Sequence, residues 1–179
     1  MEPIEVNAGA WYLRALRADE RVDDRPALLE LAADPATGLA RRRVTDLAGA
    51  LEHVAQRARG WAGGSLCSWA VCEPSTGEML GEVVLFELHG GSAELGCWLL
   101  AEHRGRGIMS TAVGAVLRLA FAAEALGGLG LRRVEWRTRP DNPASLALAA
   151  RLGFTHEGVS PGTGFEGADQ VVLARLATD

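Results

Sequence analysis

One segment constrains the fold more than any other, because residues 93–139 place a strand, a glycine and arginine loop, a helix and a second strand in succession. The first strand, "SAELGCWLL", ends at Leu100, and the loop "HRGRG" follows it. The run from Ile108 to Leu126 is apolar on most sides and stops at Gly127, and "RRVEWRTR" then reads as a strand. This order predicts a strand, helix, strand unit in which a glycine-rich loop leads into the helix.

Hydrophobic periodicity predicts further elements on both sides of this unit. The expected strands are 11–17, 65–73, 79–89 and 170–176, and the expected helices are 25–33, 45–58 and 143–152. Thr45 is the predicted N-cap of the second helix, with Leu47, Leu51, Val54 and Ala58 on its buried face. Asn142 is the predicted N-cap of the last helix, since proline follows it. The strands between residues 65 and 100 are expected to form an antiparallel set.

Length and composition favour a single domain over residues 1–179. A chain of 179 residues with 48% hydrophobic residues can bury one substantial core but is short for two ordinary domains. The formal net charge of -5 and the pI of about 5.4 argue against a nucleic-acid partner bound through a generally basic surface. The charge run Arg41–Arg43 is typical of a solvated loop or a helix entry.

Cysteine usage and hydropathy predict a cytoplasmic location. Cys67, Cys72 and Cys97 form an odd set without a CxxC pair, which suits a reducing compartment. No basic region followed by an apolar one opens the chain, and no run approaches the roughly 18 apolar residues of a membrane helix. We therefore expect neither a targeting segment nor a membrane partner.

The chain contains no lysine, so all 18 positive side chains are arginine. A Walker A phosphate loop and a Schiff base with pyridoxal phosphate both require a lysine side chain. Both chemistries are therefore excluded.

The loop from Arg104 to Ser110 has the features of an anion site. The first N–H groups of a helix lack internal partners, and the helix dipole adds partial positive charge there. Gly105 and Gly107 would let successive amides close around a pyrophosphate, with Arg104 and Arg106 beside them. The alternative is a tight turn whose arginines are only solvated. A dinucleotide fingerprint fits less well, because Ser110 stands where its third glycine belongs.

At these residues the sequence resembles the GNAT superfamily of acyl-CoA-dependent N-acyltransferases, and within it the RimJ/RimL-like branch. The loop "RGRGIM" is similar to the family motif Q/R-x-x-G-x-G/A, with Met109 in place of the usual glycine or alanine. Further matches are "AELGCWLL", "NPAS" and "RLGFTHEG", and together they span residues 93–158. The N-terminal third, which shapes acceptor pockets in such enzymes, matches only loosely. The resemblance implies an α/β (α+β) fold with a mixed, mostly antiparallel twisted sheet, splayed central strands and flanking helices.

The resemblance also implies that acetyl-CoA, or another short acyl-CoA, is the co-substrate. Its pantetheine arm would lie between the splayed strands and its pyrophosphate at the loop. The residues expected to bind it are Trp98, Leu99, Leu100, Arg104, Gly105, Arg106, Gly107, Ile108, Met109, Ser110 and Asn142. A backbone N–H near Trp98 or Leu99 would stabilise the oxyanion, whereas the Trp98 ring reads as a core aromatic. Asn142 has two compatible interpretations, helix capping and hydrogen bonding to the cofactor arm.

Two residues are candidates for catalysis by this resemblance. Glu94 stands where related enzymes carry a catalytic carboxylate, and it would need a raised pKa or a water relay to deprotonate an amine. Ser145 matches the position that protonates the leaving thiolate. The alternatives are an outward strand carboxylate and a hydroxyl that satisfies the first helical turn. Cys97 could form an acyl-cysteine, or it could be a buried, unactivated thiol.

We interpret the chain as an N-acetyltransferase that acts by direct attack of a primary amine on the thioester. The acceptor would be a protein N-terminus or a small-molecule amine, and the sequence leaves open which one and whether the chain forms a homodimer. The four histidines share no metal-ligand spacing, so no metal is expected. A non-catalytic module that senses acyl-CoA is the alternative function.

Overall fold

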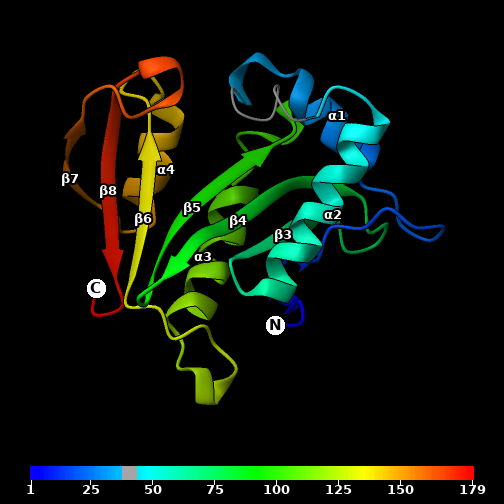
Figure 1. Ribbon diagram of the computed structural model, residues 1–179, viewed down its shortest axis with the longest axis horizontal. Coiled ribbons are helices and arrows are strands. Elements are labelled where there is room, and N and C mark those ends of the chain that lie inside the picture. The colour runs from blue at the N-terminus through cyan, green and yellow to red at the C-terminus, as the bar shows by residue number, and fades with distance from the viewer. Residues whose placement is uncertain (38–43) are drawn as a thin grey trace. The chain divides into compact units, whose positions relative to one another are not determined.

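The computed structural model describes residues 1–37 and 44–179 (Figure 1). The charge run Arg41–Arg43 lies outside the described residues. The described chain forms two compact units, which are Met1–Val84 with Cys97–Ala115, and Leu85–Gly96 with Val116–Asp179. Strands β4 (Met79–His89) and β5 (Ser92–Leu99) and helix α3 (Ile108–Phe121) each contribute residues to both units. The prediction of a single functional domain stays a prediction.

The first unit builds its sheet from β1 (Val6–Ala8), β2 (Trp11–Arg14), β3 (Leu66–Cys72) and β4, hydrogen-bonded in that order. The β1–β2 and β2–β3 pairs are antiparallel. Helices α1 (Arg25–Ala33) and α2 (Leu47–Gly63) pack on each other, and α2 also packs on β3. In the core of this unit Trp61 and Trp69 meet edge to face with ring centroids 5.1 Å apart, a favourable aromatic geometry.

The predicted strand 11–17 is shorter than expected, because the chain turns around a buried carboxylate after Arg14. The Asp24 side chain is 2% exposed, and its two oxygens accept hydrogen bonds from Nη1 and Nη2 of Arg14, each at 2.8 Å. The backbone N–H of Arg17 donates to the same carboxylate at 2.7 Å. The backbone therefore leaves the sheet to supply these donors, as a buried charge requires.

Helix α2 differs from the sequence prediction at its start and in its buried face. Asp46, not Thr45, is the N-cap, since its side chain accepts the Gly49 N–H at 2.7 Å. Leu47 and Leu51 were expected to be buried but are 53% and 47% exposed. The buried face instead carries Ala50, His53, Val54, Arg57 and Trp61. Val54 is buried as predicted, whereas Ala58 is exposed like the two leucines. The other three positions were predicted wrongly because this face also meets the buried carboxylate of Glu82, which requires polar side chains.

The second unit contains the order β5-β6-β8-β7, with β6 (Arg133–Thr138), β8 (Gln170–Leu176) and β7 (Thr155–Ser160). The β6–β8 and β7–β8 pairs are antiparallel, and the β7–β8 register shifts between His156 and Gly158. In Figure 1 these three strands lie together, with α4 (Pro143–Arg151) beside β6. The sequence analysis did not predict β1 or β7.

Strands β5 and β6 are parallel, which confirms the strand, helix, strand unit. Their register runs from Ser92↔Arg133 to Leu95↔Trp136, so the pairing ends before β5 does. Helix α3 ends at Phe121 instead of Leu126. Two of its last carbonyls are satisfied by the returning chain, because Leu129 N–H donates to Leu119 O and Leu131 N–H to Ala120 O. The mixed, mostly antiparallel α/β fold is as predicted.

No helix within the described ranges is long and apolar enough to cross a membrane.

Candidate active site

The loop before α3 has the backbone conformation that only glycine adopts easily. Gly105 and Gly107 both have φ of +76°, and no atom lies within 4 Å of a Cβ added at either position. Both residues are exposed. The glycines are therefore required by backbone conformation, while the space around them is open to a ligand.

The amides of this loop are unpaired. In the part of the chain that the structure describes, the N–H groups of residues 105–110 make no hydrogen bond, whereas the next amide, of Thr111, donates to Gly107 O at 3.1 Å. They belong to the loop and the first turn of α3, where the helix dipole adds partial positive charge. The arrangement suits a phosphate or another anion.

The two arginines of the loop are held differently. The guanidinium of Arg104 forms an ion pair with Asp34 and donates from Nη2 to Leu99 O at 2.9 Å. Arg106 is exposed, and its Nη1 lies 3.3 Å from His103 Nδ1. Arg104 thus ties the loop to the end of α1 and to β5, and Arg106 is the arginine whose charge faces solvent.

Several main-chain groups that were predicted to bind the cofactor already have hydrogen-bond partners within the protein. Leu99 O accepts from Arg104, Leu100 N–H donates to Leu80 O at 2.9 Å, and Leu100 O accepts from His103 N–H. The carbonyl of Trp98 lies against Gly81, where an added Cβ would be 2.4 Å from it. Glycine at position 81 is therefore required for β4 and β5 to approach each other here.

A buried charged cluster lies beside Trp98, and the sequence analysis did not predict it. The Glu82 side chain is 0% exposed and accepts from Arg57 Nε at 2.6 Å, with His53 Nε2 at 3.1 Å. The Arg57 guanidinium carbon lies 6.0 Å from the centre of the Trp98 ring, within cation–π range. The Trp98 ring also packs on the hydrophobic core. A glutamate inside the apolar strand "MLGEVVLF", facing histidine and arginine four residues apart, was the signal for this cluster.

Glu94 lies on β5 with its side chain 20% exposed and its Oε2 3.3 Å from Arg137 Nε. The pKa of this carboxyl is raised to about 7, mainly by burial; the charge of Arg137 opposes the rise, and the charges of Glu87 and Glu135 add to it. A carboxylate with such a pKa can act as a base near neutral pH. Glu94 is therefore not a fully exposed strand carboxylate, and its pKa is not that of an ordinary glutamate.

Ser145 and Asn142 form the start of α4. Asn142 Oδ1 accepts the Ser145 N–H at 3.1 Å, which confirms Asn142 as the N-cap. The Ser145 hydroxyl oxygen accepts the indole N–H of Trp136 at 2.9 Å. Because the hydroxyl oxygen is an acceptor in this contact, its own proton remains available for donation.

Cys97 is partly buried, and burial raises the pKa of its thiol to about 12. The thiolate form is therefore negligible at neutral pH, which favours the unactivated thiol over an acyl-cysteine relay. Among the residues described, no three histidine, cysteine or acidic side chains group so that they could hold a metal ion.

The predicted site residues fall into separate groups. Residues 98–100 and 104–110 lie in the first unit, joined by Arg104. Glu94 lies in the second unit with Arg137. Ser145 and Asn142 also lie in the second unit, with Trp136.

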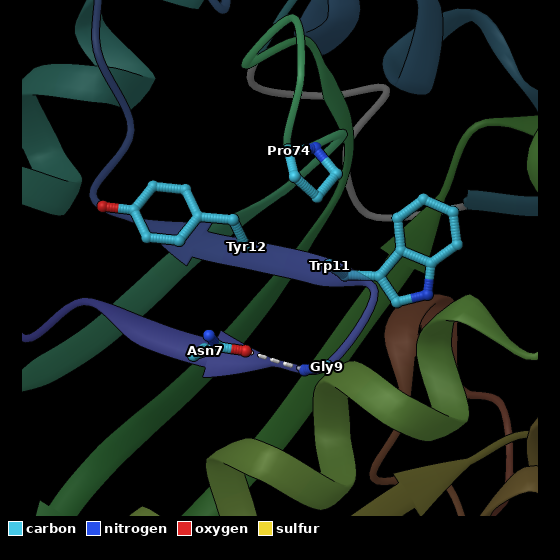
Figure 2. A pocket seen from close by; sticks show the side chains of 5 residues that line it. All are labelled: Asn7, Gly9, Trp11, Tyr12 and Pro74. Carbon is cyan, nitrogen blue, oxygen red and sulfur yellow. Dashed lines mark hydrogen bonds between the residues drawn. The ribbon is translucent and has the colours of Figure 1, made fainter.

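Surface hollows of the first unit are lined by residues other than the predicted catalytic ones. One of about 310 Å³ is lined by Asn7, Gly9, Trp11, Tyr12 and Pro74, and Figure 2 shows these side chains. Another of about 330 Å³ is lined by residues of α1 and the segment after it, together with Leu100 and Ala101, beside the Asp34 partner of Arg104.

Comparison with known proteins gives concordant results. A family model described as an acetyltransferase (GNAT) domain matches residues 12–155. A ribosomal-protein-serine acetyltransferase of Escherichia coli (strain K12) is 41% identical over 68 residues, which are 37% of this chain and 35% of that protein. The chain thus matches about a third of the length of this curated relative.

Solved structures match over almost the whole chain. A structure titled as a ribosomal-protein-serine acetyltransferase from Vibrio cholerae has a TM-score of 0.82 at 23% identity, over 98% of this chain and 99% of that one. RimL, named a ribosomal L7/L12 α-N-protein acetyltransferase and solved with coenzyme A, has a TM-score of 0.80 at 26% identity, over 97% and 98% of the two chains. The likeness to the Vibrio cholerae structure, at 23% identity, establishes only the fold.

Proposed function

Because the chain belongs to the GNAT family of acetyltransferases, in its RimJ/RimL-like branch, we propose that it transfers an acetyl group from acetyl-CoA to a primary amine. The observation that carries this proposal is the row of unpaired amides at residues 105–110, behind Gly105 and Gly107. Residues 1–179 would act together as one acyltransferase domain.

The loop suits the diphosphate of coenzyme A. Its amides are neutral donors with open space in front of them, and Arg106 adds a solvent-facing charge. We assign the pyrophosphate to residues 105–110 and the pantetheine arm to the main chain of Trp98, Leu99 and Leu100. Leu99 O and both main-chain groups of Leu100 already have partners, so the arm would compete with Arg104 for the Leu99 carbonyl.

The reaction requires an unprotonated amine, a stabilised oxyanion and a proton for the thiolate. The amine nitrogen would attack the thioester carbonyl, forming the C–N bond, and collapse of the tetrahedral intermediate would break the C–S bond. Glu94 would take the proton that the nitrogen loses, directly or through water, and Ser145 would give a proton to the departing sulfur. A main-chain N–H near Trp98 or Leu99 would face the oxyanion.

The titration of Glu94 matches its proposed role. With a pKa of about 7, about half of the carboxyl groups are ionised at neutral pH and about a tenth at pH 6. We therefore expect the protonation of Glu94 to contribute a fall in kcat/KM of about tenfold for each pH unit below 7.

The acceptor we favour is a protein N-terminus, because the relatives named above are ribosomal-protein acetyltransferases. The net charge of -5 favours a cationic substrate through steering. A small-molecule amine is the other outcome of the test. The cytoplasmic location and the homodimer stay predictions.

The cofactor part of the proposal is tested by calorimetry with acetyl-CoA on the wild type, Gly107→Glu and Gly127→Glu. Gly127, which follows α3 by six residues, has φ of +79° and the same open space, so its substitution imposes similar backbone strain outside the loop. We expect Gly107→Glu to abolish binding, since its carboxylate would occupy the anion site, and Gly127→Glu to retain it. Equal affinity in all three proteins would refute the assignment.

Turnover is tested by thiol release from acetyl-CoA with a panel of amines. The panel should contain a peptide with a free N-terminal serine, the same peptide acetylated at its N-terminus, and a polyamine. Release with the free peptide alone supports a protein acceptor. Binding without release for any amine would favour the acyl-CoA sensor over the enzyme.

A further inference from the structure

Charged side chains of alternating sign lie on one face of β6. Arg133, Glu135 and Arg137 are partly exposed, whereas the residues between them are buried. Side chains two residues apart on a strand share a face, so this face carries positive, negative and positive groups in order. Arg133 contacts Glu157 on β7 at one end, with Nη1 2.8 Å from Oε1. At the other end Arg137 contacts Glu94 on β5.

The register between β5 and β6 places two carboxylates opposite each other. Glu94 pairs with Glu135 across the parallel strands, an arrangement of like charges that is unfavourable on its own. Arg137 relieves it, because Nε lies 3.3 Å from Glu94 Oε2 and Nη2 lies 3.0 Å from Glu135 Oε2. One guanidinium therefore serves both carboxylates.

The two contacts of Arg137 are unequal. The contact with Glu135 is a hydrogen bond, whereas Arg137 Nε is buried and makes no hydrogen bond to any described group, since its ion pair with Glu94 is poorly aligned. Glu135 also accepts from Arg133 Nε at 3.1 Å. Both arginines therefore hold Glu135 by hydrogen bonds, whereas Glu94 has only a poorly aligned ion pair with Arg137.

We propose that Arg137 is a positioning residue for Glu94. Glu135 competes for the same guanidinium, and so determines how strongly the positive charge of Arg137 acts on Glu94. This inference rests on the proposed function in one respect, which is that Glu94 serves as the base. The arrangement keeps the base ionisable in a partly buried place without neutralising it in a tight ion pair. The groups that act on Glu94 electrostatically are Arg137 and Glu135 from β6 and Glu87 from the end of β4.

The test is a direct titration of the Glu94 carboxyl by carbon NMR of glutamate-labelled protein, with Glu94→Gln used to identify its signal. Arg137→Gln should raise the pKa of Glu94 by about one unit, the low end of the effect of an adjacent opposite charge, because Arg137 is 31% exposed. Glu135→Gln should lower it, because a like charge is lost and Arg137 is released toward Glu94. Arg137→Lys should give a smaller rise than Arg137→Gln, because a lysine keeps the charge but cannot bridge both carboxylates.

Glu157→Gln is the matched control, because it removes an ion-pair partner of Arg133 and leaves Arg137 untouched. Its Glu94 titration should move much less than that of Arg137→Gln, because Glu157 acts on Glu94 only indirectly, through Arg133 and Glu135. An unchanged Glu94 titration in Arg137→Gln, or shifts of the same sign in Arg137→Gln and Glu135→Gln, would overturn the inference.

The same variants separate this inference from the proposed function. If the acidic limb of kcat/KM moves with the Glu94 titration, both are supported. If the titration moves and the limb does not, the inference on Arg137 is supported and Glu94 is not the base. If the limb disappears in Glu94→Gln but the titration is insensitive to Arg137, the proposed base is supported and the inference is overturned.

Discussion

Substituting Glu94 by glutamine should make the protein less sensitive to alkaline pH, whether or not any amine is acetylated. In the folded protein the pKa of this carboxyl is raised from 4.5 to about 7. A raised acid pKa means that the folded state resists ionisation, so the contribution of Glu94 to stability is intact below pH 4.5. It is lost progressively as the pH rises through 7.

The magnitude follows from the same values. At about 1.4 kcal/mol per pH unit, the free energy of unfolding should fall by about 3 kcal/mol between pH 4.5 and pH 8 on account of Glu94 alone. Glutamine does not titrate, so Glu94→Gln should lack this component. Glu157→Gln is the control, because Arg133 lowers the pKa of Glu157, so this group contributes little to a change in stability between pH 5 and pH 8.

The assay is urea unfolding of the wild type and both variants at pH 5 and pH 8. The change in unfolding free energy between these pH values should be smaller in Glu94→Gln than in the wild type by about 2–3 kcal/mol. It should be the same in Glu157→Gln and the wild type. If Glu94→Gln retains the full pH dependence of the wild type, the carboxyl has an ordinary pKa and its proposed role as a base near neutral pH loses its physical basis.

Three further predictions concern other parts of the structure. Arg106→Ala should raise the KM for acetyl-CoA by an amount that shrinks as salt is added, whereas the effect of Arg104→Ala should depend less on salt because Arg104 is already paired; steady-state kinetics at two ionic strengths checks this. Ser145→Ala should lower kcat by at most about 10²-fold without moving the acidic limb of kcat/KM, because a hydroxyl does not titrate in this range. Steady-state kinetics across a pH series measures both quantities. Arg57→Met should lower the free energy of unfolding by up to about 3–5 kcal/mol in urea, since it leaves His53 as the remaining partner of the buried Glu82 carboxylate, and a loss below about 1 kcal/mol would contradict this.

Much of the fold could be predicted from the sequence because turns and periodicity agreed. The glycines after β4 and before α3, and proline after Asn142, marked boundaries that the structure confirms. The sequence analysis did not predict β1 and β7, because a strand of three residues and an exposed strand containing a glycine carry little hydrophobic pattern.

The local geometry of the loop and of the cap was predicted better than the side chains around them. The glycine loop and the Asn142 cap are single-segment features, which a sequence displays directly. The pairing of Glu82 with Arg57, and of Glu94 with Arg137, joins residues more than twenty positions apart, so each partner looks like an ordinary surface charge until the strands are aligned. The same limit explains α2, whose buried face was misjudged because it includes charged residues.

The break in register between β7 and β8 has a consequence for how the molecule meets copies of itself. An outermost strand offers unpaired backbone groups to any neighbouring chain, and a straight one invites continuous sheets between molecules. In β7 the irregularity between His156 and Gly158 bends the strand and disrupts its regular spacing of donors and acceptors. Self-association by sheet extension along β7 is therefore disfavoured.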